Sequence, residues 1–491
     1  MMQKNIIMAC ICVAASLSAC DNYLDIEPKG KAVLNTVEDY LGLLEPVDAE
    51  YVHDNFCYVA NEQTTGNMAE LEGYKYPIYS SCFFWDEEYD RASNITDGEA
   101  CSLLYNKCYS RIARYNILID NIGDAEGPES EKKMGIAQAK AMRAYNYFFL
   151  INTFAKPYNP STADTDHGII VRKKFELESE GKQYSVAETY ASILQDINEA
   201  LPDLPEKSVN AYHSDKAFGY ALRAKVHLYM RNIEDALNDA LEVLKFPNHE
   251  LWDLSGELAA YLAQNPQFAV LPDATKYQMF RNMVLMLNGH KYSHPENLLY
   301  CPSRTAGGPV ALRKYIRDSF DAQADLRYNV ICMPEMPARP TAEPGCLYFM
   351  HSTTTLLNTS GIRLSEIYLI IAECYARQGN IELTLKYLND LRKTRFDTRY
   401  YKDLVSADVN NNKDEALKYV REERVHELFS SYNCFFDMRR FCTEFDETLT
   451  KTYTDTNGET HTYTLKPDSH LLTFPFPVKA IQTTNLIQNS K

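Results

Sequence analysis

The sequence of 491 residues predicts an all-α fold built mainly from antiparallel helix pairs. Apolar residues at positions 233, 236, 237, 240, 241 and 244 follow the i, i+3, i+4, i+7 spacing of an amphipathic helix. The same helix–turn–helix design recurs 148 residues later without a gap, so that Ala224 matches Ala372 and Asn232 matches Asn380. Such a recurrence indicates a repeated helical unit rather than two unrelated helix pairs.

The bulk composition is that of a folded globular protein. Hydrophobic residues make up 45% of the chain, charged residues make up 24%, and the formal net charge is −17. Nucleic-acid binding requires clustered Lys and Arg, so the acidic balance argues against a nucleic-acid partner. The thirteen cysteines form no C-x-x-C pair and no zinc-ligand spacing. We expect mainly buried thiols, and one or two disulfides remain open if the compartment is oxidising.

Residues 1–19 have the layout of a signal peptide. Lys4 supplies a short positive region, an apolar run follows, and small residues precede Cys20. The run is too short to remain as a membrane span, and no later run reaches 18 apolar residues. The tetrad Leu17-Ser18-Ala19-Cys20 resembles a bacterial lipobox, which predicts that Cys20 becomes a lipid-modified mature N-terminus. A cleaved signal without lipid is the alternative.

Residues 20–250 are predicted to form an N-terminal helical region. One helix pair joins residues 101–121 to 131–154, and a less clear pair includes residues 185–201. The segment 217–230 predicts a further helix, which is separated by a two-residue turn from the amphipathic helix that starts at Ile233. The small residues Ala224 and Ala372 would let paired helices approach closely, as in a tetratricopeptide unit of about 34 residues. Antiparallel helices without a true solenoid are the alternative.

The helical pattern is lost in residues 251–360, which we interpret as an irregular, ligand-facing subdomain inserted between the repeats. Nine prolines lie between Pro266 and Pro344, and a stretch of about 110 residues is too long for a simple loop. Residues 361–491 contain the second repeat and an irregular tail. Within the tail, alternating Thr and Tyr around Asn457-Gly458 predict a minor β-hairpin at 450–464.

Five blocks of the chain are distinctive: CDNYLDIEPKG at 20–30, AQAKAMRAYNYFFLINTFAKPYNP at 137–160, RLSEIYLIIAECYARQGN at 363–380, REERVHELFSSYNCFFDMRRF at 421–441 and FPFPVKAIQTTNLIQNS at 474–490. In this order they resemble the SusD/RagB family of Bacteroidetes outer-membrane lipoproteins. Cys374 stands where alanine is usual in that family, which exchanges one small residue for another.

The resemblance implies a tetratricopeptide-like core and a role. Such proteins sit on the cell surface, anchored to the outer membrane by lipid, and capture a nutrient that is usually an oligosaccharide. They deliver it to a SusC-like TonB-dependent transporter barrel for import. Some relatives handle peptides, so a peptide is the leading alternative ligand. Asp21, Asp25 and Glu27 after Cys20 are similar to the acidic export context of surface lipoproteins in these bacteria.

The sequence predicts no catalytic residue, no cofactor and no metal site. It contains no G-x-S-x-G, H-E-x-x-H or Gly-rich phosphate-binding motif. The groups Glu423-Arg424…Glu427 and Asp437…Arg439-Arg440 are interpreted as ion pairs between helices, with Arg424 and Glu427 close enough to pair on one helix face. Asp86-Glu87-Glu88 resembles a glycosidase carboxylate pair, although adjacent acids are more typical of a solvated helix start. A lipoprotein glycosidase and a helical-repeat scaffold remain lesser alternatives.

The predicted ligand contacts are mainly aromatic, because flat rings bind sugars over a large area at low entropy cost. Residues 72–94 contain seven aromatic side chains, and some of these must belong to the core. Region 280–350 is the second candidate. With only two Trp a starch-like platform is less expected, and the acidic balance disfavours strongly anionic glycans unless a local patch overrides it. The candidate contacts are Tyr76, Tyr79, Trp85, Tyr89, Arg91, Asn94, Asn288 and Tyr292.

Overall fold

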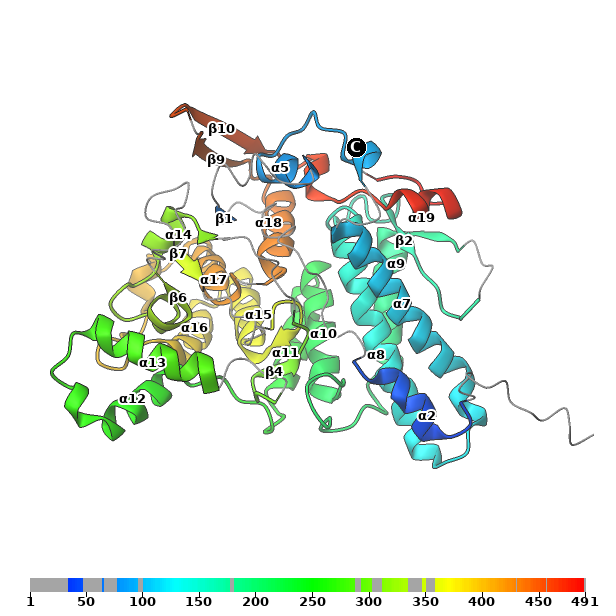
Figure 1. The fold of residues 1–491 in the computed structure, drawn as a ribbon, viewed down its shortest axis with the longest axis horizontal. Helices are drawn as coiled ribbons and strands as arrows, with labels where there is room; N and C mark the ends of the chain where they lie inside the picture. Colours follow the sequence, from blue (N-terminus) through cyan, green and yellow to red (C-terminus); the bar gives the residue numbers. More distant parts are fainter. Residues whose placement is uncertain are drawn as a thin grey trace, which may run out of the picture.

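The predicted all-α class is confirmed by the computed structural model of the chain, in which helices dominate and the sheets are small (Figure 1). The predicted signal peptide and Cys20 lie outside the described residues. The structure describes residues 34–46, 64–65, 77–95, 100–176, 181–287, 293–302, 311–333, 347–349, 358–429, 431–455 and 457–489.

Three long helices form the N-terminal part of the core: α7 (Ala100–Asn121), α8 (Glu129–Phe154) and α9 (Val186–Ala200). They lie side by side, with α8 packed against both of the others (Figure 1). The predicted pairing of 101–121 with 131–154 is therefore confirmed. A capping box starts α9, because Ser185 Oγ accepts from the Glu188 amide and the Glu188 carboxylate accepts from the Ser185 amide.

The two predicted repeats are confirmed as helix pairs. The first is α10 (Lys216–Tyr229) with α11 (Ile233–Val243), and the second is α15 (Leu364–Arg377) with α16 (Ile381–Arg395). Ala224 and Ala372 are both fully buried, as close helix packing requires. The two pairs are also neighbours, since α15 packs against α10 and α11.

The turns inside the two repeats share a backbone conformation. Arg231 has φ of 66° and the matching Gly379 has φ of 79°, so both are left-handed. This conformation carries a steric cost for a residue with a Cβ atom and little cost for glycine. The fold thus imposes a left-handed conformation on both turns, and only the second turn has glycine, which adopts it at little cost.

The C-terminal part of the core adds α17 (Lys413–Leu428) and α18 (Asn433–Glu444). Helix α17 packs on α15 and α16, and the apolar side chains of these three helices form a hydrophobic cluster of their own. Helix α18 is buried along most of its length and contacts α17. These two helices carry the arginine- and glutamate-rich block of the sequence.

The prediction that helical structure is lost throughout 251–360 is wrong in part. The region contains α12 (Leu254–Gln264) and α13 (Asp273–Leu287), which share an apolar cluster around Trp252 and Phe280. Pro266 opens a short 3₁₀ helix and Pro272 directly precedes α13. Proline is tolerated at these positions because the first amides of a helix have no partner within it.

Among the described residues, the strands form four small antiparallel sheets. One has the order β1-β5-β7-β6, and the others pair β2 with β3, β4 with β8 and β9 with β10. Their bounds are β1 Thr64–Thr65, β2 His167–Ile170, β3 Gln183–Ser185, β4 Asn297–Leu299, β5 Ala311–Leu312, β6 Cys332–Met333, β7 Leu347–Phe349, β8 Ile362–Arg363, β9 Leu449–Thr454 and β10 Thr460–Leu465.

The predicted β-hairpin is confirmed as the pair β9–β10 (Figure 1). Thr454 pairs with Thr460, so the loop has five residues rather than the two of an Asn-Gly turn. Gly458 supplies a left-handed position with φ of 87°. The Asp455 carboxylate accepts from the amides of Asn457 and Glu459, which explains why the longer loop is stable.

In the part of the chain that the structure describes, five short helices lie around this core. The tail, predicted to be irregular, contains one of them. They are α2 (Val37–Leu41), α5 (Pro77–Phe83), α6 (Arg91–Asn94), α14 (Lys314–Ser319) and α19 (Val478–Thr483).

The described cysteines agree with the expectation of buried thiols. All eight are buried: Cys82, Cys101, Cys108, Cys301, Cys332, Cys374, Cys434 and Cys442. Within the described ranges, no helix is both long enough and apolar enough to cross a membrane.

Candidate functional site

Both candidate regions of the sequence contact the β9–β10 hairpin. From the first region, the Phe83 ring lies 4.7 Å from the Tyr453 ring of β9. From the second, the Arg313 guanidinium lies 4.7 Å from the centroid of the Tyr453 ring and donates to the Thr452 carbonyl at 2.7 Å. Strands β1 and β5 also pair directly, with Thr64 opposite Leu312. Segments far apart in the sequence therefore meet at one place.

Five rings pack together there and form what we name the hairpin cluster: Phe83, Phe84, Trp85, Tyr453 and Tyr463. The Phe84 ring lies 5.3 Å from Tyr463 and 6.1 Å from Tyr453. Three of the rings are buried, whereas Phe84 and Tyr463 are half-buried and present part of their surface. Aromatic pairs at these separations stabilise one another and hold their rings in fixed orientations.

A buried lysine lies among these rings. Lys451 of β9 is 2% exposed, and its ammonium lies 4.0 Å from the Trp85 ring centroid and 4.8 Å from the Phe83 centroid. Cation–π attraction is strongest when the groups are shielded from water, as they are here. Trp85 itself is 4% exposed and has a left-handed φ of 49°. The structure thus places Trp85 in the core, where its ring binds the hairpin.

Arg91 is also a core residue. It is fully buried, and its guanidinium donates to the carbonyls of His470 and Thr473 at 2.8 and 2.9 Å. The adjacent Glu87 accepts from Ser469 Oγ at 2.5 Å and lies 3.1 Å from His470 Nε2. These contacts fix the segment around α6 to the tail. They give Glu87 a structural role.

The other candidate residues are less enclosed or fall outside the description. Tyr89 is half-buried and packs on the main core, and Asn94 is exposed and donates to the Asp90 carbonyl at 2.7 Å. Tyr79 lies in α5. Ligand contact by these three residues stays a prediction. Tyr76, Asn288 and Tyr292 lie outside the described residues.

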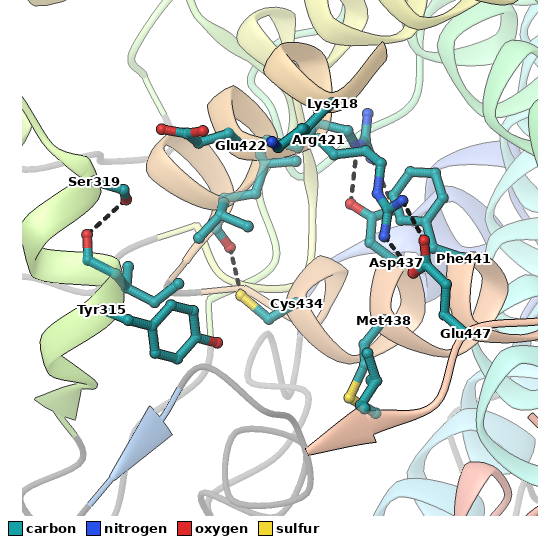
Figure 2. A pocket seen from close by; sticks show the side chains of 15 residues that line it. Tyr315, Ser319, Lys418, Arg421, Glu422, Cys434, Asp437, Met438, Phe441 and Glu447 are labelled. Carbon is teal, nitrogen blue, oxygen red and sulfur yellow. Dashed lines mark hydrogen bonds and ion pairs between the residues drawn. The ribbon is translucent and has the colours of Figure 1, made fainter. Parts of the chain in front are cut away.

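A cavity of about 450 Å³ opens next to the hairpin cluster, between α14, α17, α18 and the start of β9 (Figure 2). Tyr315 is half exposed on one side of it, and Arg421 and Glu447 stand on the other. Arg313 connects the cavity to the cluster, because its guanidinium lies 5.9 Å from the Tyr315 ring as well as against Tyr453. We call the cavity and the hairpin cluster together the hairpin site.

The polar wall of the cavity is ordered. Arg421 donates to both carboxylate oxygens of Glu447, at 2.8 and 2.6 Å, and its guanidinium stacks 4.6 Å from the Phe441 ring. Bidentate contacts hold both groups in one geometry. Burial, reinforced by the neighbouring carboxylate of Glu423, raises the pKa of Glu422 on the same wall. The cavity therefore combines an aromatic face with fixed hydrogen-bonding groups.

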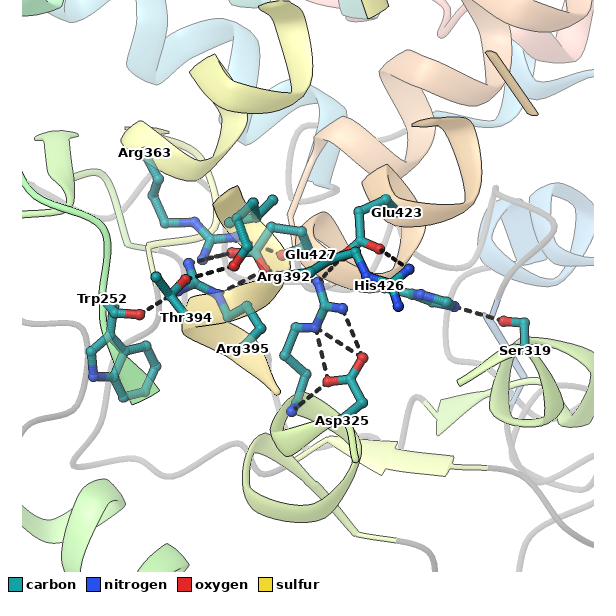
Figure 3. Close-up of polar contacts among 12 residues, drawn as sticks. Trp252, Ser319, Asp325, Arg363, Arg392, Thr394, Arg395, Glu423, His426 and Glu427 are labelled. Atoms are coloured by element: carbon teal, nitrogen blue, oxygen red, sulfur yellow. Dashed lines mark hydrogen bonds and ion pairs between the residues drawn. The ribbon is translucent and has the colours of Figure 1, made fainter. Parts of the chain in front are cut away.

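Beneath the cavity, buried ion pairs join the helices (Figure 3). The Arg327 guanidinium contacts Glu423 at 2.6 Å and Asp325 at 2.7 Å, and Arg395 contacts Glu427 at 3.0 Å. The predicted role of this block as ion pairs between helices is confirmed. The predicted pairing of Arg424 with Glu427 is wrong, because neighbouring helices supply better partners for both.

A second network joins α15, α17 and α18. Arg424 donates to Asp437 at 2.8 Å, and Arg440 holds both oxygens of Glu373 at 2.7 Å. Burial alone would raise the pKa of Glu373, but the guanidinium groups of Arg440, Arg377 and Arg424 outweigh it and hold the pKa far below its usual range. A carboxylate held permanently charged in this way is suited to structure and unsuited to proton transfer. Arg439 donates to the Ala155 carbonyl.

Among the described residues, one group has its potential metal-ligand atoms close together. Asp455, Glu459 and His461 in the hairpin loop place these atoms within 4.8 Å of one another. The Asp455 carboxylate already accepts from two loop amides and lies 2.9 Å from His461 Nε2. Contacts within the turn account for this grouping, so we assign it no metal.

Tyr315, the most exposed ring of the site, is not predicted as a site residue from the sequence. Tyr315 has no motif around it, and only its position on α14 beside the cavity identifies it. The sequence pattern predicts Tyr453 and Tyr463 as strand residues of the hairpin but does not identify them as part of a site. Their alternation with Thr was the available signal, because alternate strand residues face the same side.

The helical core, the inserted segment and an aromatic site beside it define a helical-repeat binding protein. Two family models match the chain: one described as "Starch-binding associating with outer membrane" over residues 22–228, and the SusD family over residues 350–487. The chain belongs to the SusD/RagB family. No curated protein matches it.

Solved structures show the same fold at low identity. A SusD superfamily protein from Bacteroides thetaiotaomicron has 18% identity and a TM-score of 0.66, with 93% of this chain and 100% of that chain covered. A SusD-like carbohydrate binding protein from Bacteroides vulgatus has 18% identity and a TM-score of 0.58, covering 92% and 97%. A laminarin binding SusD-like protein has 16% identity and a TM-score of 0.61, covering 93% and 99%.

Proposed function

We propose that the protein is a surface-exposed lipoprotein of the cell outer membrane that captures an oligosaccharide at the hairpin site. It delivers the saccharide to a SusC-like TonB-dependent transporter for import and catalyses no reaction on it. Lipid attached to Cys20 anchors it. Family membership supports the general role, and the single structural observation that carries the site is the exposed Tyr315 ring beside the cavity.

Binding at this site follows from stacking and hydrogen bonding. A sugar ring stacked on Tyr315 would cover apolar surface, while its hydroxyls would meet Arg421 and Glu447. A cavity of about 450 Å³ is within the size range of small-molecule sites. Because the polar groups are already held by one another, little ordering entropy is lost on binding.

A peptide is the second candidate ligand. The paired charges of Arg421 and Glu447 would also suit the charged ends of a short peptide. A binding panel that presents a glycan array and a peptide library to the purified mature protein separates the two ligands. Affinity is expected for only one of the two classes.

The delivery role is tested in the source cells. A tagged protein should co-purify with a large β-barrel, and Cys20→Ala should release the protein from the membrane fraction. Surface location predicts that added protease degrades the anchored protein in intact cells. If no barrel co-purified and no glycan or peptide bound, the proposal would be abandoned; if the Cys20→Ala protein stayed in the membrane fraction, the lipid anchor would be rejected.

A further inference from the structure

A second cavity, of about 370 Å³, lies away from the hairpin site. It is lined by α7, the segment that follows β2, and α19. In Figure 1, α7 and α19 lie on the right of the molecule, whereas β9 and β10 lie at the upper left. The proposed function makes no use of this cavity.

Its lining is cationic in a strongly acidic protein. Arg172, Lys174 and Lys479 line it, against the single carboxylate of Glu176. Within the described part of the chain, none of these three cations forms an ion pair. The neighbouring Lys173, by contrast, pairs with Asp196 at 2.8 Å. With a net charge of −17 on the whole chain, this local excess of positive charge is unusual.

The segment that carries Arg172 and Lys174 is held in place by α7 and α8. Asn116 Nδ2 donates to the carbonyls of Arg172 and Lys174 at 3.0 and 3.1 Å. The Arg172 amide donates to Tyr147 Oη at 2.7 Å, and the Phe175 amide donates to Asp120 at 3.2 Å. A backbone fixed at four points presents its side chains to the cavity with little cost in ordering.

The rest of the lining suits a sugar. The Phe175 ring is 43% exposed at the cavity, which is uncommon for phenylalanine. Tyr105 and Tyr109 pack 4.5 Å apart on its α7 wall. Burial raises the pKa of Tyr105 to about 12, so this wall stays uncharged at physiological pH. Asn106 and Thr483 add neutral hydrogen-bonding groups.

We propose that this cavity is a second saccharide site, which binds a sugar carrying a carboxylate or sulfate group. The cations would hold the anionic group and Phe175 would stack on the sugar ring. The volume is more than ten times the roughly 30 Å³ that one water molecule occupies, so a bare inorganic anion would leave most of it unfilled. This proposal does not depend on the hairpin site, because the two cavities are separate and either could lack a bound sugar without affecting the other.

The test uses calorimetry on the purified mature chain with four probes at low salt: a galacturonate trimer, a sulfated galactan tetrasaccharide, neutral maltotriose and inorganic sulfate. The informative variant is K174Q/K479Q. Its matched control is K207Q/K402Q, which removes the same charge from exposed lysines elsewhere. We expect at least one acidic saccharide to bind, and K174Q/K479Q to weaken it about tenfold or more while the control changes it less than twofold.

Phe175→Ala separates a saccharide from a simple anion. It should weaken the acidic saccharide without changing the response to sulfate, and Tyr315→Ala should leave the acidic saccharide unaffected. The carboxylated and sulfated probes show which anionic group the site prefers. The proposal is overturned if neither acidic saccharide binds, if both double variants weaken binding equally, or if sulfate binds as tightly as the saccharides. None of these results depends on whether a neutral sugar binds at the hairpin site.

Discussion

The ammonium of Lys451 lies 4.0 Å from the centroid of the Trp85 ring, although the two residues are separated by most of the chain. Both side chains are almost fully buried. This contact fastens the β9–β10 hairpin to the segment that follows α5, and it covers the ring face that a sugar would otherwise use. The hairpin site therefore depends on Trp85 for its construction and on neighbouring rings for its contact surface.

Replacement of Trp85 should primarily affect stability. Trp85→Ala removes a large buried ring and the cation–π contact with Lys451, so we expect the free energy of unfolding to fall by about 3–5 kcal/mol. Denaturant titration measures this change. Val270→Ala is the control, because Val270 is 89% exposed and its loss should cost no more than about 0.5 kcal/mol. A loss below 1 kcal/mol for Trp85→Ala would show that the ring is not a core element.

Glu373 should contribute stability that acid removes. Its pKa in the folded state lies below the ordinary 4.5, because Arg440, Arg377 and Arg424 outweigh the effect of burial. Its stabilisation is therefore present above about pH 4.5 and is lost as the pH falls towards the folded-state pKa. Glu373→Gln leaves buried guanidinium groups without their partner, so we expect a loss of about 3–5 kcal/mol at neutral pH.

The free energy of unfolding of Glu373→Gln should depend less on pH below pH 4.5 than that of the wild type. Urea titrations at several pH values would measure this. Glu242→Gln, at a partly exposed site paired only with Lys245, serves as the control and should stay near wild type. If Glu373→Gln left the loss of stability in acid unchanged, the stabilising role of the Glu373 carboxylate would be contradicted.

His426 should make the protein less stable in mild acid. Burial against Phe320 lowers its pKa to about 3, and its Nε2 lies 2.7 Å from Ser319 Oγ. Because the unfolded side chain takes up a proton near its ordinary 6.5 and the folded one does not, stability is full above about pH 6.5 and declines below it. The decline from this group is at most about 1.4 kcal/mol per pH unit.

His426→Gln keeps a polar group for Ser319 but cannot titrate in this range, so the loss of stability between pH 6.5 and 5 should become smaller. Val270→Ala, at an exposed site without a titratable group, should keep the wild-type slope. If both variants gave the same slope as the wild type, burial of a neutral His426 would be refuted.

The two repeat turns make a matched pair of opposite predictions. Arg231→Gly should raise the free energy of unfolding by up to about 1 kcal/mol, because a left-handed φ costs arginine more than glycine. Gly379→Ala should lower it by about 1 kcal/mol for the same reason, and a Cβ atom there would meet nothing closer than 4.0 Å. Thermal and urea unfolding would measure both, and changes of the same sign would show that the turn conformation is not the cause.

Much of the helical core could be predicted from the sequence. The second repeat copies the apolar spacing of the first, and that spacing alone decides which face is buried. Helices α12 and α13 are not evident from the sequence, because the prolines of this region suggest helix breaks, although Pro266 and Pro272 lie at helix starts, where proline is tolerated. The hairpin was predicted from alternation, but its five-residue loop depends on hydrogen bonds to Asp455 that no pattern reveals.

The sequence predicts the region of the hairpin site but not which of its side chains are exposed. The described part of the segment 72–94, residues 77–94, does reach the hairpin site, yet which of its rings are buried depends on partners near the other end of the chain. Trp85 is covered by Lys451, and Arg91 by the carbonyls of His470 and Thr473. Tyr315 gave no local signal, because exposure beside a cavity arises only from the folded arrangement.

The most direct test of the central claim is calorimetric binding of neutral oligosaccharides to the mature protein and its Tyr315→Ala variant. We predict a dissociation constant in the micromolar range, about −8 kcal/mol, for at least one oligosaccharide. Loss of the exposed Tyr315 ring should weaken this binding about tenfold or more without lowering the free energy of unfolding by more than about 0.5 kcal/mol. Equal affinity of both proteins, or no affinity of the wild type for any oligosaccharide, would contradict capture at the hairpin site.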